Sequence, residues 1–471
     1  MSQAGTSEAQ QLGPDRTMVL IVATLGGFLV TFMSSAINIA LPMIEEEFGM
    51  SAVTLSWISL AYVLVAGATL LPAGRLADMY GRVRLFIWGM VIFTVFAFAS
   101  AFAPSAGVLL ALRAVHGLGL AIGAVTATAL VILAYPVESR GRALGINVAG
   151  VYLGLTLGPV LGGLIVHNLG WRSLFLIVGA LGLVNLVLPV WKLRHLDWRE
   201  PERAHFDTVG SAFSAVSLFA LMLGFSFLPQ IPGIVLVVGG IAGIAAFVWW
   251  ETRATDPLLD VGLFRHNRVF AFSNVATFIN YSATAAMVFL MSLYLQYNRG
   301  LDAQTAGLVL VTGTFIQTVF SLVAGRLADR TEARYVAASG MAASAVGLFA
   351  LSFLSTMTPY WYIVVMLCLI GAGLAFFSTP ATHAVMGSVG IQSVGIASAT
   401  LATMRQTGMS MSTGVATLVL AIEVGRQAIG PKDYPALLTS IKITFVIFAV
   451  LCVFGVAASL VGPRRGEAPR G

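Results

Sequence analysis

Charged residues are scarce in this sequence. They make up 10% of the 471 residues, while 58% are hydrophobic, and the mean hydropathy is +0.91. Soluble domains carry about 25% charged residues, so this composition excludes a water-soluble chain. Cysteine is scarce too. The two cysteines, Cys368 and Cys452, both fall inside apolar runs, which excludes a disulfide framework or a zinc site. We expect neither a metal nor a cofactor.

Long apolar runs dominate what remains. Each is about 20 residues, enough for a helix to cross a hydrocarbon core of roughly 30 Å. We count fourteen runs and predict an all-α integral membrane protein with little chain left for a soluble domain. The predicted organisation is a cytoplasmic tail at 1–17, a six-helix domain at 18–191, a cytoplasmic linker with two inserted spans at 192–268, a second six-helix domain at 269–461 and a cytoplasmic tail at 462–471.

The positive charges predict the orientation. The formal net charge is +6, and 19 of the 26 Lys and Arg residues fall in the tails and loops on one side of the predicted membrane, against five on the other. Because positive loops stay in the cytoplasm, we expect both termini inside and a multi-pass protein of the cell membrane. This also explains the charge without a nucleic-acid partner. The expected partners are membrane lipid and a small molecule, with the protein acting as a monomer.

A six-residue segment, AGRLAD, occurs twice, at 73–78 and at 324–329. Such a repeat predicts two related halves. The first copy, with Gly74, Asp78, Gly81 and Arg82, closely resembles the signature loop of the major facilitator superfamily. The second copy keeps two of these positions and has Glu and Ala in place of the last two. The retained positions are Gly325 and Asp329.

That resemblance implies the superfamily's fold of two six-helix domains with a central cavity, and a conformational switch at these loops. It also implies that, in the outward-open state, Asp78 caps the cytoplasmic N-terminus of a span that begins near Ser393. From the residues themselves, we expect the glycines to allow helix ends to approach closely.

A run of glycines spaced four apart follows, comprising Gly150, Gly154, Gly158 and Gly162, with Pro159 inside it. This spacing places the glycines on one ridge of a helix, where another helix can pack closely, and the proline removes one backbone hydrogen bond. The segment resembles the superfamily's antiporter signature, which implies export. Ordinary close packing is the alternative.

Two polar residues lie in the predicted fourth span. Arg113 and His116 resemble the superfamily's intramembrane arginine motif, with His116 in place of the usual glutamine. Because histidine titrates near neutral pH, His116 is a candidate proton carrier. The alternative is a neutral histidine bonded to a neighbouring carbonyl or serine.

The arrangement of six, two and six spans resembles the fourteen-span drug:proton antiporter branch. The first span keeps that branch's Asn38 but has Met33 where the branch carries a membrane-embedded aspartate. We find no acidic residue at mid-membrane in any predicted span. This departure weakens the implied proton coupling and the implied transport of cationic drugs.

Other polar residues deep in the spans follow helical spacing and form stripes in both halves. These stripes line a cavity or form hydrogen bonds between helices; because they come from both halves, we favour a cavity. The candidate lining residues, with Met33 and Asn38, are Tyr62, Asn274, Tyr281, Gln317 and Arg405.

The sequence thus predicts a secondary active transporter and not an enzyme, since it has no phosphate loop, metal pattern or catalytic triad. We expect export of amphipathic small molecules or drugs by alternating access, coupled to protons. The alternative is a proton-independent carrier of lipids or anions that uses Arg113 and Arg405.

Overall fold

The structure is a computed structural model of the whole chain. It describes residues 13–135, 137–194, 207–228, 230–254, 258, 261–389, 394–425 and 429–461. Within these ranges every regular element is a helix. The predicted C-terminal tail and most of the N-terminal one lie outside them.

The helices divide into three groups along the chain. The first comprises α2 (Gly13–Phe48), α3 (Ala52–Tyr80), α4 (Arg82–Ala101), α5 (Ala106–Ala134), α6 (Val137–Leu169) and α7 (Trp171–Lys192). The second is the pair α8 (Thr208–Phe227) and α9 (Ile231–Glu251), followed by the short α10 (Val261–His266). The third comprises α11 (Arg268–Thr284), α12 (Met287–Leu293), the π-helical turn η1 (Tyr294–Asn298), α13 (Ala303–Arg330), α14 (Ala333–Leu351), α15 (Tyr360–Gly387), α16 (Val394–Glu423), the 3₁₀ turn η3 (Pro431–Asp433) and α17 (Tyr434–Leu460).

Twelve helices in the described part of the chain are long and apolar enough to cross a membrane. The expected count of fourteen is not confirmed. Neither α8 nor α16 is among the twelve: only Thr208–Leu221 of α8 counts as a shorter apolar helix. Helix α16 is polar for its length because it carries many serine and threonine residues besides Arg405 and Gln406.

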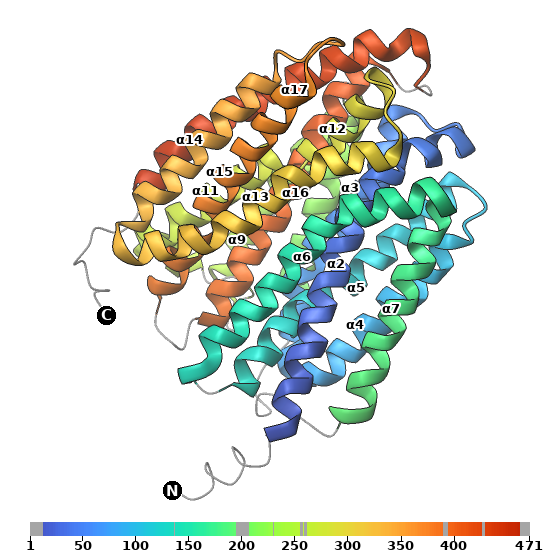
Figure 1. Cartoon of the computed structure of the whole chain (residues 1–471). Coiled ribbons are helices and arrows are strands. Elements are labelled where there is room, and N and C mark those ends of the chain that lie inside the picture. The colour runs from blue at the N-terminus through green and yellow to red at the C-terminus, as the bar shows by residue number, and fades with distance from the viewer. Residues whose placement is uncertain are drawn as a thin grey trace, which may run out of the picture.

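The first and third groups pack by the same scheme and are called here the N half and the C half. In the N half α2 packs on α6 and α7, α5 on α3 and α4, and α4 on α7. In the C half α11 packs on α16 and α17, α15 on α13 and α14, and α14 on α17. The AGRLAD copies lie at equivalent places, in the last turns of α3 and α13. Figure 1 shows the two halves side by side.

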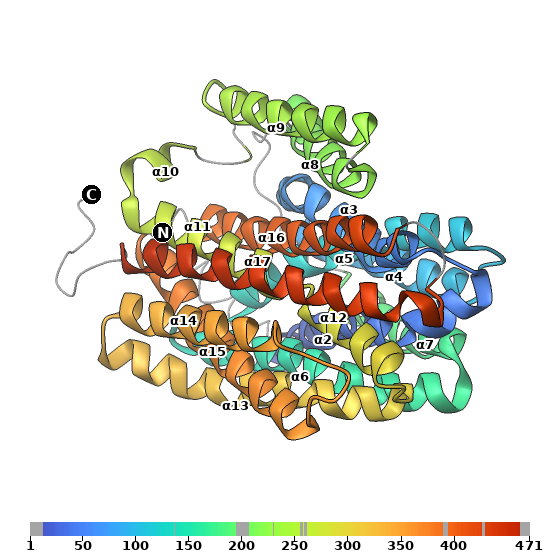
Figure 2. The same cartoon turned by 90° about the horizontal axis from the view of Figure 1, so that it is seen from above.

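The pair α8–α9 lies at the edge of the bundle (Figure 2). Helix α8 contacts α3 of the N half and α16 of the C half. Asp207 holds the pair together, since one carboxylate oxygen accepts from the Gly210 amide and the other from the Trp250 indole N–H, at 2.8 and 2.9 Å.

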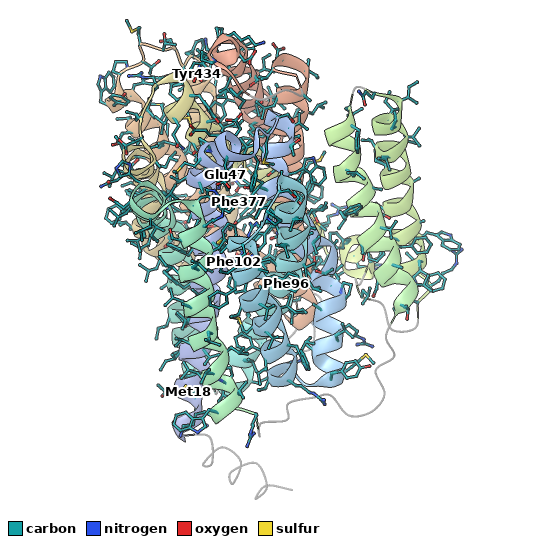
Figure 3. All side chains as sticks on the ribbon, turned by 90° about the vertical axis from the view of Figure 1, so that its right-hand side faces the viewer. Met18, Glu47, Phe96, Phe102, Phe377 and Tyr434 are labelled. Atoms are coloured by element: carbon teal, nitrogen blue, oxygen red, sulfur yellow. The ribbon has the colours of Figure 1, made fainter. Side chains whose placement is uncertain are left out.

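Helix α2 begins, and α17 ends, at one end of the bundle, called the terminal end; the opposite end is called the far end (Figure 1). Figure 3 shows Met18 near the former and Glu47 with Tyr434 near the latter. Polar caps start helices at the far end. Ser51 accepts from the Thr54 amide, and Asp302 accepts from the Thr305 amide, a bond that lowers the pKa of the Asp302 carboxyl.

Candidate functional site

The loop between α3 and α4 turns at a single glycine. Gly81 ends α3 and begins α4 with φ of +96°, a backbone conformation that other residues adopt only with strain. Its amide donates to the Ala77 carbonyl at 3.1 Å. The motif glycine is therefore required by the backbone. In the C half a bend of ordinary backbone at Thr331 and Glu332 does the same, which explains how that copy dispenses with glycine.

The other two motif glycines do not behave as expected. A Cβ at Gly74 would lie 3.5 Å from Val125, and one at Gly325 would lie 3.6 Å from Thr379, which are ordinary contacts. The predicted close approach is therefore not seen in this conformation. Arg82 is half-buried at the start of α4. The side chains of Asp78 and Asp329, and Ser393, lie outside what the structure describes, so the predicted cap stays a prediction.

The glycine ridge of α6 packs directly on α2, as the spacing predicts. A Cβ at Gly158 would lie 2.7 Å from Ser35 Cβ, and one at Gly162 would lie 2.7 Å from Ala36 Cβ. A Cβ at Gly154 would overlap Thr31 and the Phe28 carbonyl, and one at Gly150 would overlap Thr24. The absence of side chains on α6 lets the two backbones meet.

Hydroxyl groups of α2 reinforce this contact. Pro159 has no N–H to donate to the carbonyl of Leu155, and the Ser35 hydroxyl donates to that carbonyl instead, at 3.2 Å. Thr31 donates to the Val151 carbonyl one turn away, at 2.9 Å. Because of the proline, the Leu155 carbonyl of α6 lacks its usual helical donor, and Ser35 of α2 supplies one.

We expect Gly154→Leu to destabilise the protein, because the new side chain must push α2 and α6 apart. Overpacking of this kind costs about 2 kcal/mol. For a folding unit of roughly 150–250 residues, which is the size of one half, this lowers the melting temperature by roughly 4–8 °C. Gly239→Leu is the matched control, since a Cβ at Gly239 of α9 meets nothing within 4 Å. Thermal unfolding of the purified variants in detergent measures the difference. Equal melting temperatures would remove the ridge as a packing element.

Arg113 and His116 are both fully buried in the N half, at 0% exposure. The Arg113 Nε donates to the Ile58 carbonyl at 3.2 Å, and its guanidinium lies 4.0 Å from the Tyr62 ring centre. A second guanidinium nitrogen lies 3.1 Å from His116 Nδ1. Since arginine only donates, Nδ1 accepts, and His116 is the neutral tautomer with its proton on Nε2. In this conformation His116 is thus a neutral histidine, bonded to Arg113 and not to a carbonyl or a serine.

The predicted lining residues are distributed unevenly. Met33, Tyr62 and Asn274 are fully buried, and Gln317 nearly so, in the packed interior. Asn38 accepts from Ser59 of α3, and its carbonyl accepts from Ser292 of α12, which joins the two halves. Tyr281 and Arg405 are half-buried in the C half, with the Arg405 carbon Cζ 5.7 Å from the Tyr281 ring centre.

Contacts between the halves close the bundle toward the far end. Thr156 of α6 bonds Thr318 of α13 at 3.0 Å near the middle of both helices, and Ser56 of α3 bonds Thr417 of α16 at 2.7 Å near the far end. Backbones also meet there: a Cβ at Gly307 of α13 would overlap the Pro159 carbonyl.

Nearer the middle, two further bonds join the halves. The Gln406 amide donates to the Val63 carbonyl at 2.9 Å, and the Tyr152 hydroxyl lies 3.3 Å from Ser378 Oγ. Sequence reasoning missed Tyr152, Gln406 and Gly307. Only the polarity of the segment around Arg405 signalled Gln406; the other two carry no distinctive pattern.

Comparison with known proteins agrees with this architecture. The sequence matches the Major Facilitator Superfamily over residues 23–413, with a second match over 273–471. It is 33% identical over 412 residues to multidrug resistance protein Stp of Mycobacterium tuberculosis (strain CDC 1551 / Oshkosh), covering 86% of this chain and 76% of that protein. It is 31% identical over 403 residues to cephamycin export protein CmcT of Amycolatopsis lactamdurans, covering 83% and 82%.

A solved structure shares the fold. It is the inward-facing, occupied crystal structure of a bacterial homologue of the human lysosomal transporter Spinster, which superposes with a TM-score of 0.69 at 16% identity over 95% of this chain and 96% of that one. The match to the family covers most of the chain, and the relatives are transporters. The chain therefore belongs to the major facilitator superfamily, and it is a multi-pass secondary transporter and not an enzyme.

Proposed function

We propose that this transporter exports amphipathic small molecules, drugs among them, across the cell membrane by alternating access. The observation that carries the proposal is the closure of the far end by direct contacts between the N half and the C half. With the positive loops in the cytoplasm, the far end faces outside. The conformation is then the one that excludes the exterior, and export requires these contacts to break.

Two observations support export as the direction. The Gly–Pro ridge of α6 resembles the antiporter signature of exporters, and it contacts α2 on one side and α13 of the other half across Gly307. This helix therefore lies at the interface between the N half and the C half, called here the seam, which must open during export. The relatives named for multidrug resistance and cephamycin export point to the same direction.

Proton coupling is part of the proposal, with His116 as the carrier. In this conformation the imidazole accepts from Arg113 and its ring packs between Tyr62 and Phe93, at centroid distances of 5.2 and 4.4 Å. Protonation at Nδ1 would replace that acceptor by a second donor, so it requires Arg113 to turn away. A proton thus binds only in a conformation that separates the two side chains, which is the difference between states that coupling needs.

Transport into proteoliposomes tests both parts. The probes are two fluorescent amphiphiles with the same aromatic body, 9-anthracenecarboxylate and 9-(aminomethyl)anthracene. We expect an imposed pH gradient to drive uphill transport of at least one of them, and a protonophore to abolish it. We expect His116→Gln to keep downhill transport and to lose the response to the gradient. His266→Gln, which changes an exposed histidine of α10, is the control.

Gradient-driven transport that is unchanged in His116→Gln would exclude His116 as the carrier. A wild-type protein that moves a probe only downhill, at every imposed gradient, would exclude antiport. The absence of movement of either probe would contradict the proposed export of amphipathic molecules of this kind.

A further inference from the structure

Of Arg113 and Arg405, the two arginines predicted to lie deep in the membrane, Arg405 is the one that remains accessible in this conformation. It lies midway along α16, half-buried, and one guanidinium nitrogen donates to the Thr382 hydroxyl of α15 at 2.8 Å. Its Nε is buried without a hydrogen-bond partner. A charged donor that is left with unused capacity in a low-dielectric interior is costly unless something else binds it.

The charge of Arg405 is not balanced by the residues around it. Among the residues whose side chains the structure describes, no carboxylate forms an ion pair with Arg405; the described ion pairs involve Arg172, His167 and Arg334. Its polar neighbours are neutral hydroxyl groups. The Thr382 hydroxyl already donates to the Ser378 carbonyl at 2.8 Å, while those of Tyr281 and Tyr152 can donate to an anion. An arginine surrounded by neutral donors is a site for an anion.

The hydroxyl groups come from both halves. Tyr281 of α11 lies beside Arg405 in the C half, and Tyr152 of α6 reaches across from the N half within electrostatic range of both. Tyr152 also lies 3.3 Å from Ser378 of α15. An oxyanion bound between Arg405 and these tyrosines would therefore join helices of both halves, and α6 of the N half moves away when the halves separate.

Arg113 does not offer an equivalent site. One of its guanidinium nitrogens also has no hydrogen-bond partner, but the side chain is fully buried within the N half, where it donates to the Ile58 carbonyl and to His116 and packs on the face of Tyr62. Of the two arginines that the sequence places in the membrane, only Arg405 stands at the seam between the halves.

We propose that Arg405, held in place by Thr382, binds an oxyanionic group of the cargo together with the hydroxyls of Tyr281 and Tyr152, so that the transported amphiphiles are anions. This rests on the proposed function and specifies its substrate class. It also accounts for the lack of an acidic residue at mid-membrane in the first span, where Met33 stands: a carboxylate there favours a cationic cargo and disfavours an anionic one.

Equilibrium binding to the purified full-length protein tests the site separately from transport. The probe is 9-anthracenecarboxylate, followed by fluorescence anisotropy, with 9-(aminomethyl)anthracene as the cationic match. We expect the wild type to prefer the carboxylate, and Arg405→Gln to weaken its binding at least about tenfold, since hydrogen bonds to charged groups are worth that factor or more. Binding of the ammonium probe should not weaken.

Two further variants control for folding and for non-specific charge. Arg405→Lys keeps the charge without the planar fork, and we expect it to retain part of the affinity. Arg253→Gln removes an exposed arginine that stacks on Trp249 just after α9, in the pair at the edge of the bundle. We expect this variant to bind the carboxylate probe as the wild type does. Melting temperatures of all variants show whether a loss of binding is a loss of fold.

The outcomes separate the site from the function. Carboxylate binding that is unchanged in both Arg405 variants, or a wild type that prefers the ammonium probe, overturns the anion site. Arg405-dependent binding without transport keeps the site and overturns the proposed export. Transport of the ammonium probe without carboxylate binding keeps the proposed export and overturns the anion site.

A lipid headgroup presents the same oxyanion chemistry as a soluble carboxylate. Nitrobenzoxadiazole-labelled phosphatidate, scored for movement between leaflets in proteoliposomes, distinguishes the two. Movement that Arg405→Gln abolishes, together with competition against the carboxylate probe, identifies the cargo as a lipid anion. Competition without leaflet movement identifies a soluble amphiphile. Failure of phosphatidate to compete restricts the site to small carboxylates.

Discussion

Gly307→Ala should shift the transporter away from the conformation described here and toward one that is open at the far end. The added methyl group would overlap the Pro159 carbonyl oxygen of α6, a backbone atom that cannot move out of the way by changing rotamer. The contact exists only when the N half and the C half meet at this end. The clash therefore raises the free energy of the closed form and leaves the open form unchanged.

The expected shift is large. Overpacking costs about 1–3 kcal/mol, and each 1.4 kcal/mol changes a population ratio about tenfold. Alanine also favours the helix over glycine by about 1 kcal/mol, but it does so in both conformations, and this gain cancels. Gly163→Ala should act in the same direction, because its Cβ would lie 2.7 Å from the Ala303 carbonyl oxygen.

Spin labels on opposite halves measure the shift. Phe102, after α4, and Met357, before α15, are 74% and 86% exposed at the far end and accept labels as cysteines once Cys368 and Cys452 are replaced by alanine. Double electron–electron resonance should show a longer distance in Gly307→Ala than in Gly239→Ala, whose methyl group meets nothing within 4 Å. Identical distance distributions would mean that α6 and α13 do not separate during transport.

The sequence predicted those features that depend on local spacing. The AGRLAD repeat indicated two halves, and the helices pair by one scheme in each. Four-residue glycine spacing indicated the ridge that packs on α2, because a helix surface follows from its own residues. Arg113 with His116 was predictable for the same reason, since residues three apart share a helix face.

The features at the seam depend on which helix of one half faces which helix of the other, and no local spacing encodes this. Tyr152 and Thr382 are neutral hydroxyl residues of a kind common in membrane helices, and only the packed structure brings them near Arg405. Gly307 is a single glycine without a repeat. Glu45 is one of three consecutive acidic residues, a pattern that gives no sign of burial, but α2 continues to Phe48 and Glu45 is buried.

Glu45 ties the two halves together at the far end, and Glu45→Ala should release them. One carboxylate oxygen accepts from the Tyr297 hydroxyl of η1 at 3.0 Å, and the other accepts from the Ile429 amide before α17 at 3.2 Å. The side chain is 7% exposed. Both donors belong to the C half while Glu45 belongs to the N half, so both bonds must break when this end opens.

We expect Glu45→Ala to raise the open population about tenfold or more, because hydrogen bonds to a charged group contribute about 1.5–3 kcal/mol each and part of this is offset by the cost of burying the carboxylate. Tyr297→Phe removes one of the two bonds and should give a smaller shift in the same direction. The spin-label pair at positions 102 and 357 reports both.

Glu47→Gln is the matched control for the contact between Glu45 and the C half. Glu47 lies two residues further along α2, but its carboxylate accepts from the Trp171 indole at 2.8 Å and pairs with Arg172, both within the N half. Its loss should lower the stability of that half without changing the distance between the labels. If Glu45→Ala and Tyr297→Phe give the wild-type distance while Glu47→Gln lengthens it, the closure of the far end depends on the shape of the N half and not on a bond between the halves.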